Sequence, residues 1–210
     1  MDNVHAVIPT APTAYRRQIL HEEKRTHLPI SLILWFSLFF LVGILLYHLL
    51  SPSPDLFSCG SLDHFLCMLS AEKDDLPRFI FMIFDSYKFE GLLLFLAFLF
   101  TLTFLSPILC SLLCAFYGLT TGVAATHTLL MARIGALSTM TCTLFLCKEA
   151  IFCAILVFFS SRSLSLSRRL SGMSFRRFFV ICQLISAHFI KIAICYLLFL
   201  TVLLVMFIIL

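Results

Sequence analysis

The stretch ISLILWFSLFFLVGILLYHLL, residues 30–50, decides the fold class of this chain. A helix needs about 20 apolar residues to cross a bilayer, and this run reaches that length without an Asp, Glu, Lys or Arg. Trp35 and Tyr47 lie near its two ends, where amphipathic aromatic side chains anchor a helix among the lipid headgroups. A long polar leader precedes the run and no small-residue cleavage site follows it before Ser51. We therefore expect a first transmembrane helix that is retained.

The composition points to a membrane protein along the whole chain. Hydrophobic residues make up 61% of the 210 residues and charged residues 12%, whereas soluble domains average about 25% charged. A soluble protein of this size has no core able to bury so much apolar surface. The net charge of +4 does not indicate a nucleic-acid partner, because the basic residues adjoin apolar runs, as suits anionic lipid headgroups. The sequence predicts an all-α, polytopic transmembrane helical bundle that contacts membrane lipid.

Three further apolar tracts follow, at residues 91–131, 137–159 and 185–210. The first has the length of one overlong helix or of two spans, and Pro107 lies near its middle, where proline interrupts helical hydrogen bonding. Lys and Arg concentrate on the cytoplasmic side of membrane proteins. The basic leader and the basic segment 160–177 share one side only if the chain crosses five times. We therefore expect about five spans, with the N-terminus cytoplasmic and the C-terminus extracytoplasmic.

This span count assigns each segment to one side of the membrane. We expect a cytoplasmic leader at 1–29, a first helix at 30–50, an extracytoplasmic amphipathic segment at 51–90, three helices within 91–160, a basic cytoplasmic loop at 161–184 and a last helix at 185–210. The outer segment contains apolar stretches with the spacing of short amphipathic helices. Its aromatic residues are the candidates for docking an extracytoplasmic partner: Phe57, Phe65, Phe81 and Phe84.

The chain has nine cysteines, and most of them fall within the predicted spans. We expect those to pack as small hydrophobic residues. Cys59 and Cys67 fall in the outer segment, where a disulfide and a pair of reduced thiols are both open interpretations. Cys110 and Cys114 share a helix face, but no His or carboxylate at ligand spacing completes a metal site there. The sequence predicts no bound metal and no cofactor.

Lys148 and Glu149 lie near the middle of the predicted fourth span. Charges at that depth cost a few kcal/mol and are candidates for a functional site. Direct neighbours on a helix point about 100° apart, so we expect each to bond a different helix, with His127 among the candidate partners. A packing role in fixing the bundle is favoured over an ion or substrate path, because the spans show no repeated acidic positions.

Gly118 and Gly122 form a G-x-x-x-G pattern in the predicted third span. Such small residues let two helices approach closely. In a protein with several spans we expect them to serve packing within the bundle, and homodimerisation is the second interpretation. No catalytic, phosphate-binding or metal-binding motif is present in the sequence, so we do not expect an enzyme.

The order of these features from residue 91 onward resembles the stage II sporulation protein M family of bacterial membrane proteins. The matching features are Gly91-Leu92, Pro107, Phe116-Tyr-Gly118-Leu-Thr-Thr-Gly122, the turn at Gly135, a polar pair in the fourth span and a basic segment after it. The family has a proline where this chain has Cys147, and it has uncharged polar residues where this chain has Lys148 and Glu149.

The resemblance implies a non-catalytic scaffold in the bacterial cell membrane. A family protein of this kind localises peptidoglycan-degrading enzymes while the mother cell engulfs the forespore. The alternative function is a transporter or channel component, such as a partner of an export permease, in which Lys148, Glu149 and His127 line a polar path. The polar pair and the outer segment are the parts of the sequence that separate these two functions.

Overall fold

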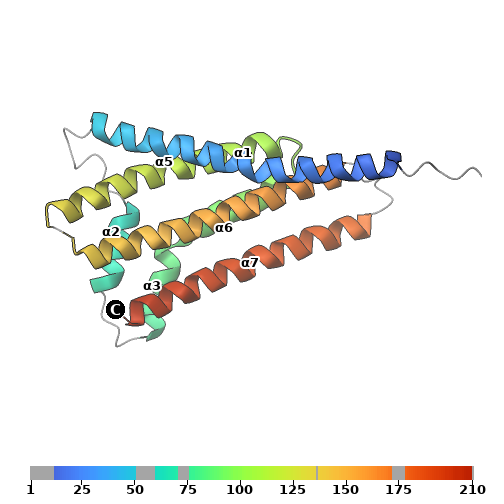
Figure 1. The fold of residues 1–210 in the computed structure, drawn as a ribbon. Helices are drawn as coiled ribbons and strands as arrows, with labels where there is room; N and C mark the ends of the chain where they lie inside the picture. Colours follow the sequence, from blue (N-terminus) through green and yellow to red (C-terminus); the bar gives the residue numbers. More distant parts are fainter. Residues whose placement is uncertain (1–11, 51–59, 71–75, 136, 172–177, 210) are drawn as a thin grey trace, which may run out of the picture.

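The computed structural model describes the backbone of residues 12–50, 60–70, 76–135, 137–171 and 178–209. These residues form seven helices and so confirm the predicted all-α class (Figure 1). The helices are α1 (Pro12–Leu50), α2 (Gly60–Ser70), α3 (Leu76–Ser86), α4 (Lys88–Phe100), α5 (Ser106–Arg133), α6 (Thr139–Ser171) and α7 (Phe178–Ile209).

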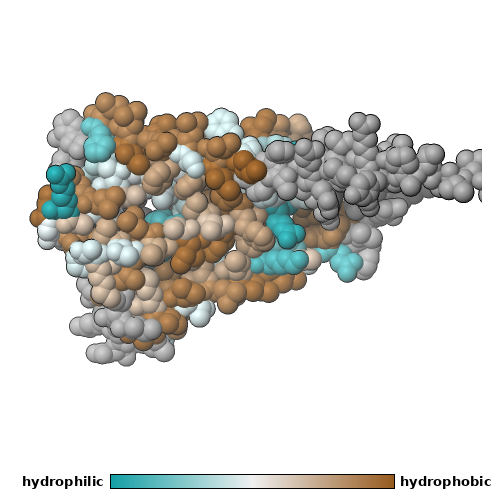
Figure 2. Space-filling view, viewed as in Figure 1, coloured by the Kyte–Doolittle hydropathy of each residue, from teal (hydrophilic) through white to brown (hydrophobic). Residues whose placement is uncertain are grey.

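Four of the described helices are long and apolar enough to cross a membrane: residues 30–50 of α1, α5, residues 139–168 of α6, and residues 181–208 of α7. Apolar residues cover most of the surface in view (Figure 2). This surface would be unfavourable in water and suits contact with lipid tails. The four helices support the prediction of a multi-pass membrane protein, while the span count of five stays a prediction.

The second of the five expected spans would lie between residue 91 and Pro107, but the helix observed in this region is short. Helix α4 begins at Lys88 and ends at Phe100, so its 13 residues rise only about 20 Å. Helix α3 leads directly into it, because Tyr87 N–H donates to the Ile83 carbonyl at 3.0 Å and Gly91 N–H donates to the Tyr87 carbonyl at 3.3 Å. This apolar segment therefore forms two consecutive helices, α3 and α4, which are separated at Tyr87.

Two residues mark helix boundaries as predicted: Pro107 at the start of a helix and Gly135 after the end of one. Helix α5 begins at Ser106 with Pro107 in its first turn, where the missing proline N–H has no helical partner to lose. The tract 91–131 is thus two helices. Gly135 adopts a φ of +76°, which glycine reaches without steric cost, and ends the turn after α5. Ser138 Oγ then accepts the Thr141 N–H at 3.1 Å and caps the start of α6.

Helices α1 and α5 run in the same direction and touch through glycine. A Cβ at Gly118 would lie 2.5 Å from the Phe36 carbonyl oxygen, and one at Gly122 would collide with the Phe40 carbonyl oxygen. Gly43 faces the backbone of α5 equally closely. The contact repeats every four residues on both helices, so the G-x-x-x-G pattern packs inside the bundle, as expected, and its face is occupied by α1.

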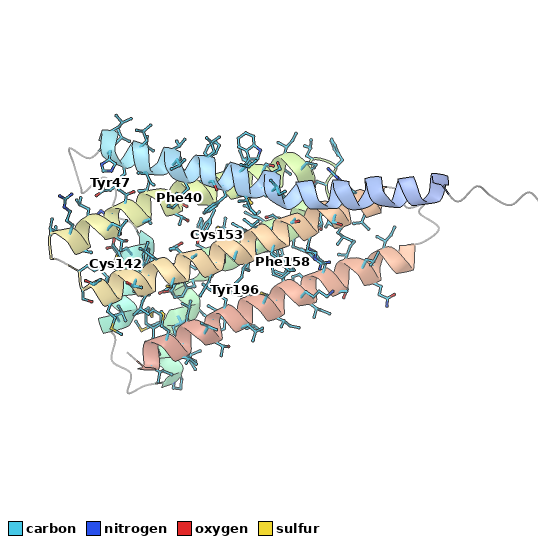
Figure 3. The ribbon with its side chains drawn as sticks, viewed as in Figure 1. Phe40, Tyr47, Cys142, Cys153, Phe158 and Tyr196 are labelled. Carbon is cyan, nitrogen blue, oxygen red and sulfur yellow. The ribbon has the colours of Figure 1, made fainter. Side chains whose placement is uncertain are left out.

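The same two helices also meet at their C-terminal ends. Tyr47 Oη lies 3.0 Å from His127 Nδ1, and both side chains are buried. Figure 3 shows Phe40 and Tyr47 on the side of α1 that faces α5. Glycine contacts in the middle and a polar contact at the end therefore hold α1 along its whole apolar part.

The two short helices α2 and α3 pack across the opposite end of the bundle from the start of α1 (Figure 1). Phe65 of α2 is fully buried, with ring centroids 5.5 Å from Phe145 of α6 and 5.4 Å from Phe207 of α7. Phe79 of α3 also contacts Phe207, at 6.4 Å. The described part of the outer segment is thus joined to the transmembrane core.

The expected basic loop at 161–184 is helical wherever the structure describes it. Helix α6 continues to Ser171 and α7 begins at Phe178. Ser167 Oγ donates to the Thr103 carbonyl at 3.0 Å, which fixes this end of α6 against the turn between α4 and α5. The start of α1, the end of α6 and the start of α7 lie at the same end of the bundle (Figure 1).

Alanine at the helix contact should separate α1 from α5. We expect Gly118→Ala and Gly122→Ala to weaken the folded protein, because each Cβ meets backbone that cannot rotate away. The matched control is Gly91→Ala in α4, whose Cβ would lie nearest to the outer end of the Tyr196 side chain and not to backbone. The measurement is unfolding in mixed micelles followed by emission of Trp35, the only tryptophan and a residue of α1. Equal stability of Gly118→Ala and Gly91→Ala would contradict the close backbone contact.

Candidate functional site

Three charged side chains meet inside the bundle. Lys148 and Glu149 come from α6 and Glu90 from the first turn of α4, and their exposed fractions are 1%, 4% and 6%. Lys148 lies nine residues after the start of α6, about 14 Å of helix rise, so it is near the middle of an apolar layer about 30 Å thick. Charges at this depth need partners, and the contacts between these residues supply them.

The ammonium group of Lys148 joins two carboxylates. Its Nζ donates to Glu149 Oε1 at 2.6 Å and lies 3.5 Å from Glu90 Oε1. As expected, Lys148 and Glu149 each bond a different helix. The contact between Lys148 and Glu149 themselves was not predicted. Their Cβ atoms point in different directions, but the four-carbon stem of Lys148 is long enough to bring its Nζ back to the neighbouring carboxylate.

Aromatic residues enclose the three charges. Tyr117 of α5 donates its hydroxyl to Glu149 Oε2 at 2.6 Å, which ties α5 to α6. Lys148 Nζ lies 5.1 Å from the centroid of the Tyr87 ring and 5.2 Å from that of Phe145, in the range of cation–π contacts. The Tyr87 hydroxyl is buried and has no hydrogen-bond partner within the described part of the chain. We call Glu90, Tyr117, Lys148 and Glu149 the buried charge cluster.

The two carboxylates of the cluster have different contacts. Glu149 accepts two short hydrogen bonds, one from Lys148 Nζ and one from the Tyr117 hydroxyl, both at 2.6 Å. Glu90 has the longer contact, with its Oε1 3.5 Å from Lys148 Nζ. Glu149 is therefore the more strongly bonded of the two carboxylates.

A groove reaches the cluster from the lipid side. It lies between α1, α5 and α6, has a volume of about 700 Å³, and is lined mainly by apolar residues. Its polar lining is Ser37, Thr121 and Glu149. The carboxylate that closes the cluster on one side is thus also part of the wall of this groove.

The structure separates the residues that the sequence grouped as intramembrane polar candidates. His127 pairs with Tyr47 and lies ten residues beyond Tyr117 on α5, about 15 Å along the helix axis. The structure therefore does not support His127 as a partner of Lys148 or Glu149. The actual partners, Glu90 and Tyr117, were missed. Glu90 was assigned to the acidic outer segment, although it is the last acidic residue before a long apolar run.

The structure also separates the phenylalanines that were predicted to dock a partner into buried and exposed residues. Phe65 is fully buried and is therefore corrected to a core residue. Phe81 and Phe84 of α3 are exposed, Phe81 to 73%. Phe57 and Cys59 lie outside the described residues, so the disulfide and the reduced thiols both stay open interpretations for Cys59 and Cys67. In the part of the chain that the structure describes, no three His, Cys, Asp or Glu side chains come together as a metal site would require.

Comparison with known proteins adds no relative. No protein-family model matches the chain, and no match appears among curated proteins or solved structures.

Removal of the ammonium group should destabilise the bundle severely. Lys148→Met leaves two buried carboxylates without their cation, and loss of one partner of a buried ion pair typically costs about 3–5 kcal/mol. The control is Lys88→Met, which breaks an exposed pair with Asp85 at 2.9 Å and should change little. The measurement is the free energy of unfolding of each variant in mixed micelles. Similar losses from both substitutions would contradict the assignment.

The two carboxyl groups should respond differently to neutralisation. Glu90→Gln removes only the longer contact to Lys148, at 3.5 Å, so we expect a moderate loss of free energy of unfolding. Glu149→Gln removes the ionised acceptor of both Lys148 and Tyr117 and should cost several-fold more free energy of unfolding. The same unfolding measurement checks this order. A larger loss for Glu90→Gln would show that Glu149 is not the main hydrogen-bond acceptor of the cluster.

Proposed function

We propose that the protein is a non-catalytic, multi-pass membrane scaffold. The observation that carries this proposal is the closed arrangement of the buried charge cluster. Lys148 lies between Glu90 and Glu149, and Tyr117 closes the far side of Glu149. Charges that bond one another in this way fix helices α4, α5 and α6 in one arrangement, and a fixed arrangement suits a protein that positions others.

The surface for a partner is the end of the bundle formed by α2 and α3. Helix α3 directs Phe79 and Ile83 into the core and leaves Phe81 and Phe84 exposed. An exposed aromatic pair on a helix that is anchored through its other face presents apolar area without flexible loops, a property of interface hot spots. In the five-span topology that we propose, with the N-terminus cytoplasmic, this end lies on the extracytoplasmic side.

The specific form of the proposal rests on the residues that resemble the stage II sporulation protein M family. The partners would then be peptidoglycan-degrading enzymes at a bacterial cell membrane, and the process would be engulfment of the forespore. The two glycines of that resemblance, Gly118 and Gly122, and the proline, Pro107, all have structural roles in the bundle. The residues that match the family therefore belong to the helix bundle against which α2 and α3 pack.

One observation favours the second candidate function, a transporter or channel component. The groove between α1, α5 and α6 reaches Glu149, so a cation has access to one side of the cluster. This function requires flux through the purified protein in liposomes under a proton or sodium gradient. Flux that Glu149→Gln abolishes, while Trp35 emission shows the protein still folded, would replace the scaffold proposal. Flux no higher than in empty liposomes would support the scaffold.

Exposed phenylalanines of α3 should be needed for recruitment. In an endospore-forming host that lacks the gene, we expect the wild-type chain to restore localisation of the peptidoglycan-degrading enzymes and migration of the engulfing membrane. A Phe81→Ser and Phe84→Ser double variant should reach the membrane at normal levels but fail in both. The measurement is fluorescence imaging of the tagged enzymes and of the membrane.

The matched control is Phe104→Ser, which changes a phenylalanine exposed to 88% in the turn at the other end of the bundle. This variant should restore engulfment. Normal engulfment with the double variant would remove α3 as the docking surface. Normal engulfment in the strain without the gene would overturn the sporulation role itself.

A further inference from the structure

A second hollow lies between α6 and α7, away from the buried charge cluster. Its volume is about 320 Å³, and helix α6 contributes Phe158, Arg162 and Ser165 to its wall, while α7 contributes Leu184, His188 and Lys191. The hollow is toward the end of the bundle where α6 ends and α7 begins (Figure 1). Figure 2 shows hydrophilic residues at the surface of this part of the molecule, beside the apolar surface of the spans.

The depth of this hollow matches the boundary between lipid tails and headgroups. Helices α6 and α7 are antiparallel and each is longer than a single crossing needs. About 20 residues counted from the start of α6 at Thr139 end at Phe158, and about 20 counted back from the end of α7 at Ile209 end at Ile190. By this count Lys191 lies at the edge of the apolar layer, and Arg162 lies four residues, about 6 Å, beyond it on the headgroup side.

Two polar side chains of the hollow, Arg162 and His188, are held in place. Arg162 has its guanidinium carbon 5.4 Å from the centroid of the Phe158 ring. His188 is buried, its Nε2 lies 3.2 Å from Ser163 Oγ, and its ring packs against Phe98 and Phe159. A site with two cations and an ordered imidazole loses little side-chain freedom when it binds an anion.

The charge of the hollow is positive, with no compensating carboxylate among its described lining residues. No Asp or Glu lines it, and no ion pair joins Arg162 or Lys191 to a carboxylate within the described ranges. The rest of the wall is apolar, formed by side chains such as Phe159, Leu166 and Leu184. A ligand that fits must carry an anionic group at the level of the headgroups and hydrocarbon below it.

We propose that this hollow binds one anionic phospholipid, with its phosphate beside Arg162 and Lys191 and one acyl chain against the apolar wall between α6 and α7. Basic recesses between transmembrane helices recognise lipid headgroups in this way. A zwitterionic phospholipid carries its own cation beside the phosphate, so it gains less binding free energy from the two basic side chains. A free phosphate ion matches the charge but leaves the apolar wall uncovered. The site is independent of the scaffold function, because it uses no residue of the buried charge cluster or of α3.

The test is native mass spectrometry of the purified full chain with added phosphatidylglycerol. In the Arg162→Gln and Lys191→Gln double variant we expect binding to fall about 25-fold, about fivefold for each cation at about 1 kcal/mol per charge. The control variant, Arg133→Gln with Lys88→Gln, removes two cations at the opposite end and should bind as the wild type does. Arg162→Lys should keep most of the affinity, because it keeps the charge.

Two further ligands decide what the site recognises. Phosphatidylcholine should bind weakly to every variant, and millimolar inorganic phosphate should not displace phosphatidylglycerol. Equal binding by the two double variants would overturn the site. Equal binding of phosphatidylcholine and phosphatidylglycerol would overturn the charge recognition, and displacement by inorganic phosphate would show that the ligand is a soluble phosphate compound. Trp35 emission, measured on each variant, shows that the protein is folded.

Discussion

An ammonium group in the middle of an apolar bundle must have carboxylates within reach, and this requirement fixes three helices of the protein relative to one another. Lys148 on α6 needs Glu90 on α4, and the second carboxylate, Glu149, needs the Tyr117 hydroxyl on α5. Separation of any of these helices would leave a charge or a hydroxyl group unpaired in hydrocarbon. Apolar helices in lipid have little preference among alternative packings. The cluster stabilises one arrangement of these helices over the others.

Glycine adds the fourth helix to this frame. Residues 30–50 of α1 are mostly exposed to their surroundings, so the position of this part of the helix depends on backbone contact at Gly43, Gly118 and Gly122. The two ends of the frame then differ in chemistry. One end carries α2 and α3 with their exposed aromatic residues, and the other has the basic hollow between α6 and α7. A scaffold that docks a protein at one end and an anionic lipid at the other would use both.

Sequence patterns predicted the parts of the fold that depend on local physics. The apolar run at 30–50, the helix start at Pro107 and the turn at Gly135 each follow from the properties of the residues themselves. The internal use of Gly118 and Gly122 and the burial of Lys148 and Glu149 also followed from position within a span. Helix ends were less predictable, because α6 and α7 continue past the apolar region through serine- and arginine-containing turns.

The partners in the site were not predictable, for a physical reason. Glu90 and Asp85 look alike in sequence, yet Asp85 pairs with Lys88 at the surface and Glu90 is buried. Asp85 is in α3 and Glu90 in α4, and the packing of these two helices decides which carboxylate faces α6. The same holds for Phe65 and Phe81, which lie on short helices with apolar residues on more than one face. Tertiary packing decides which of these residues are buried, and the local sequence pattern does not predict it.

The most direct test of the central claim is a double-mutant cycle between Glu90 and Lys148. The free energies of unfolding of the wild type, Glu90→Gln, Lys148→Met and the double variant give the coupling between α4 and α6. Contacting residues of one network show couplings of about 0.5–3 kcal/mol, and we expect a value in the upper half of that range. Additive effects, within about 0.3 kcal/mol, would show that Lys148 does not join the two helices and would contradict this account of the bundle.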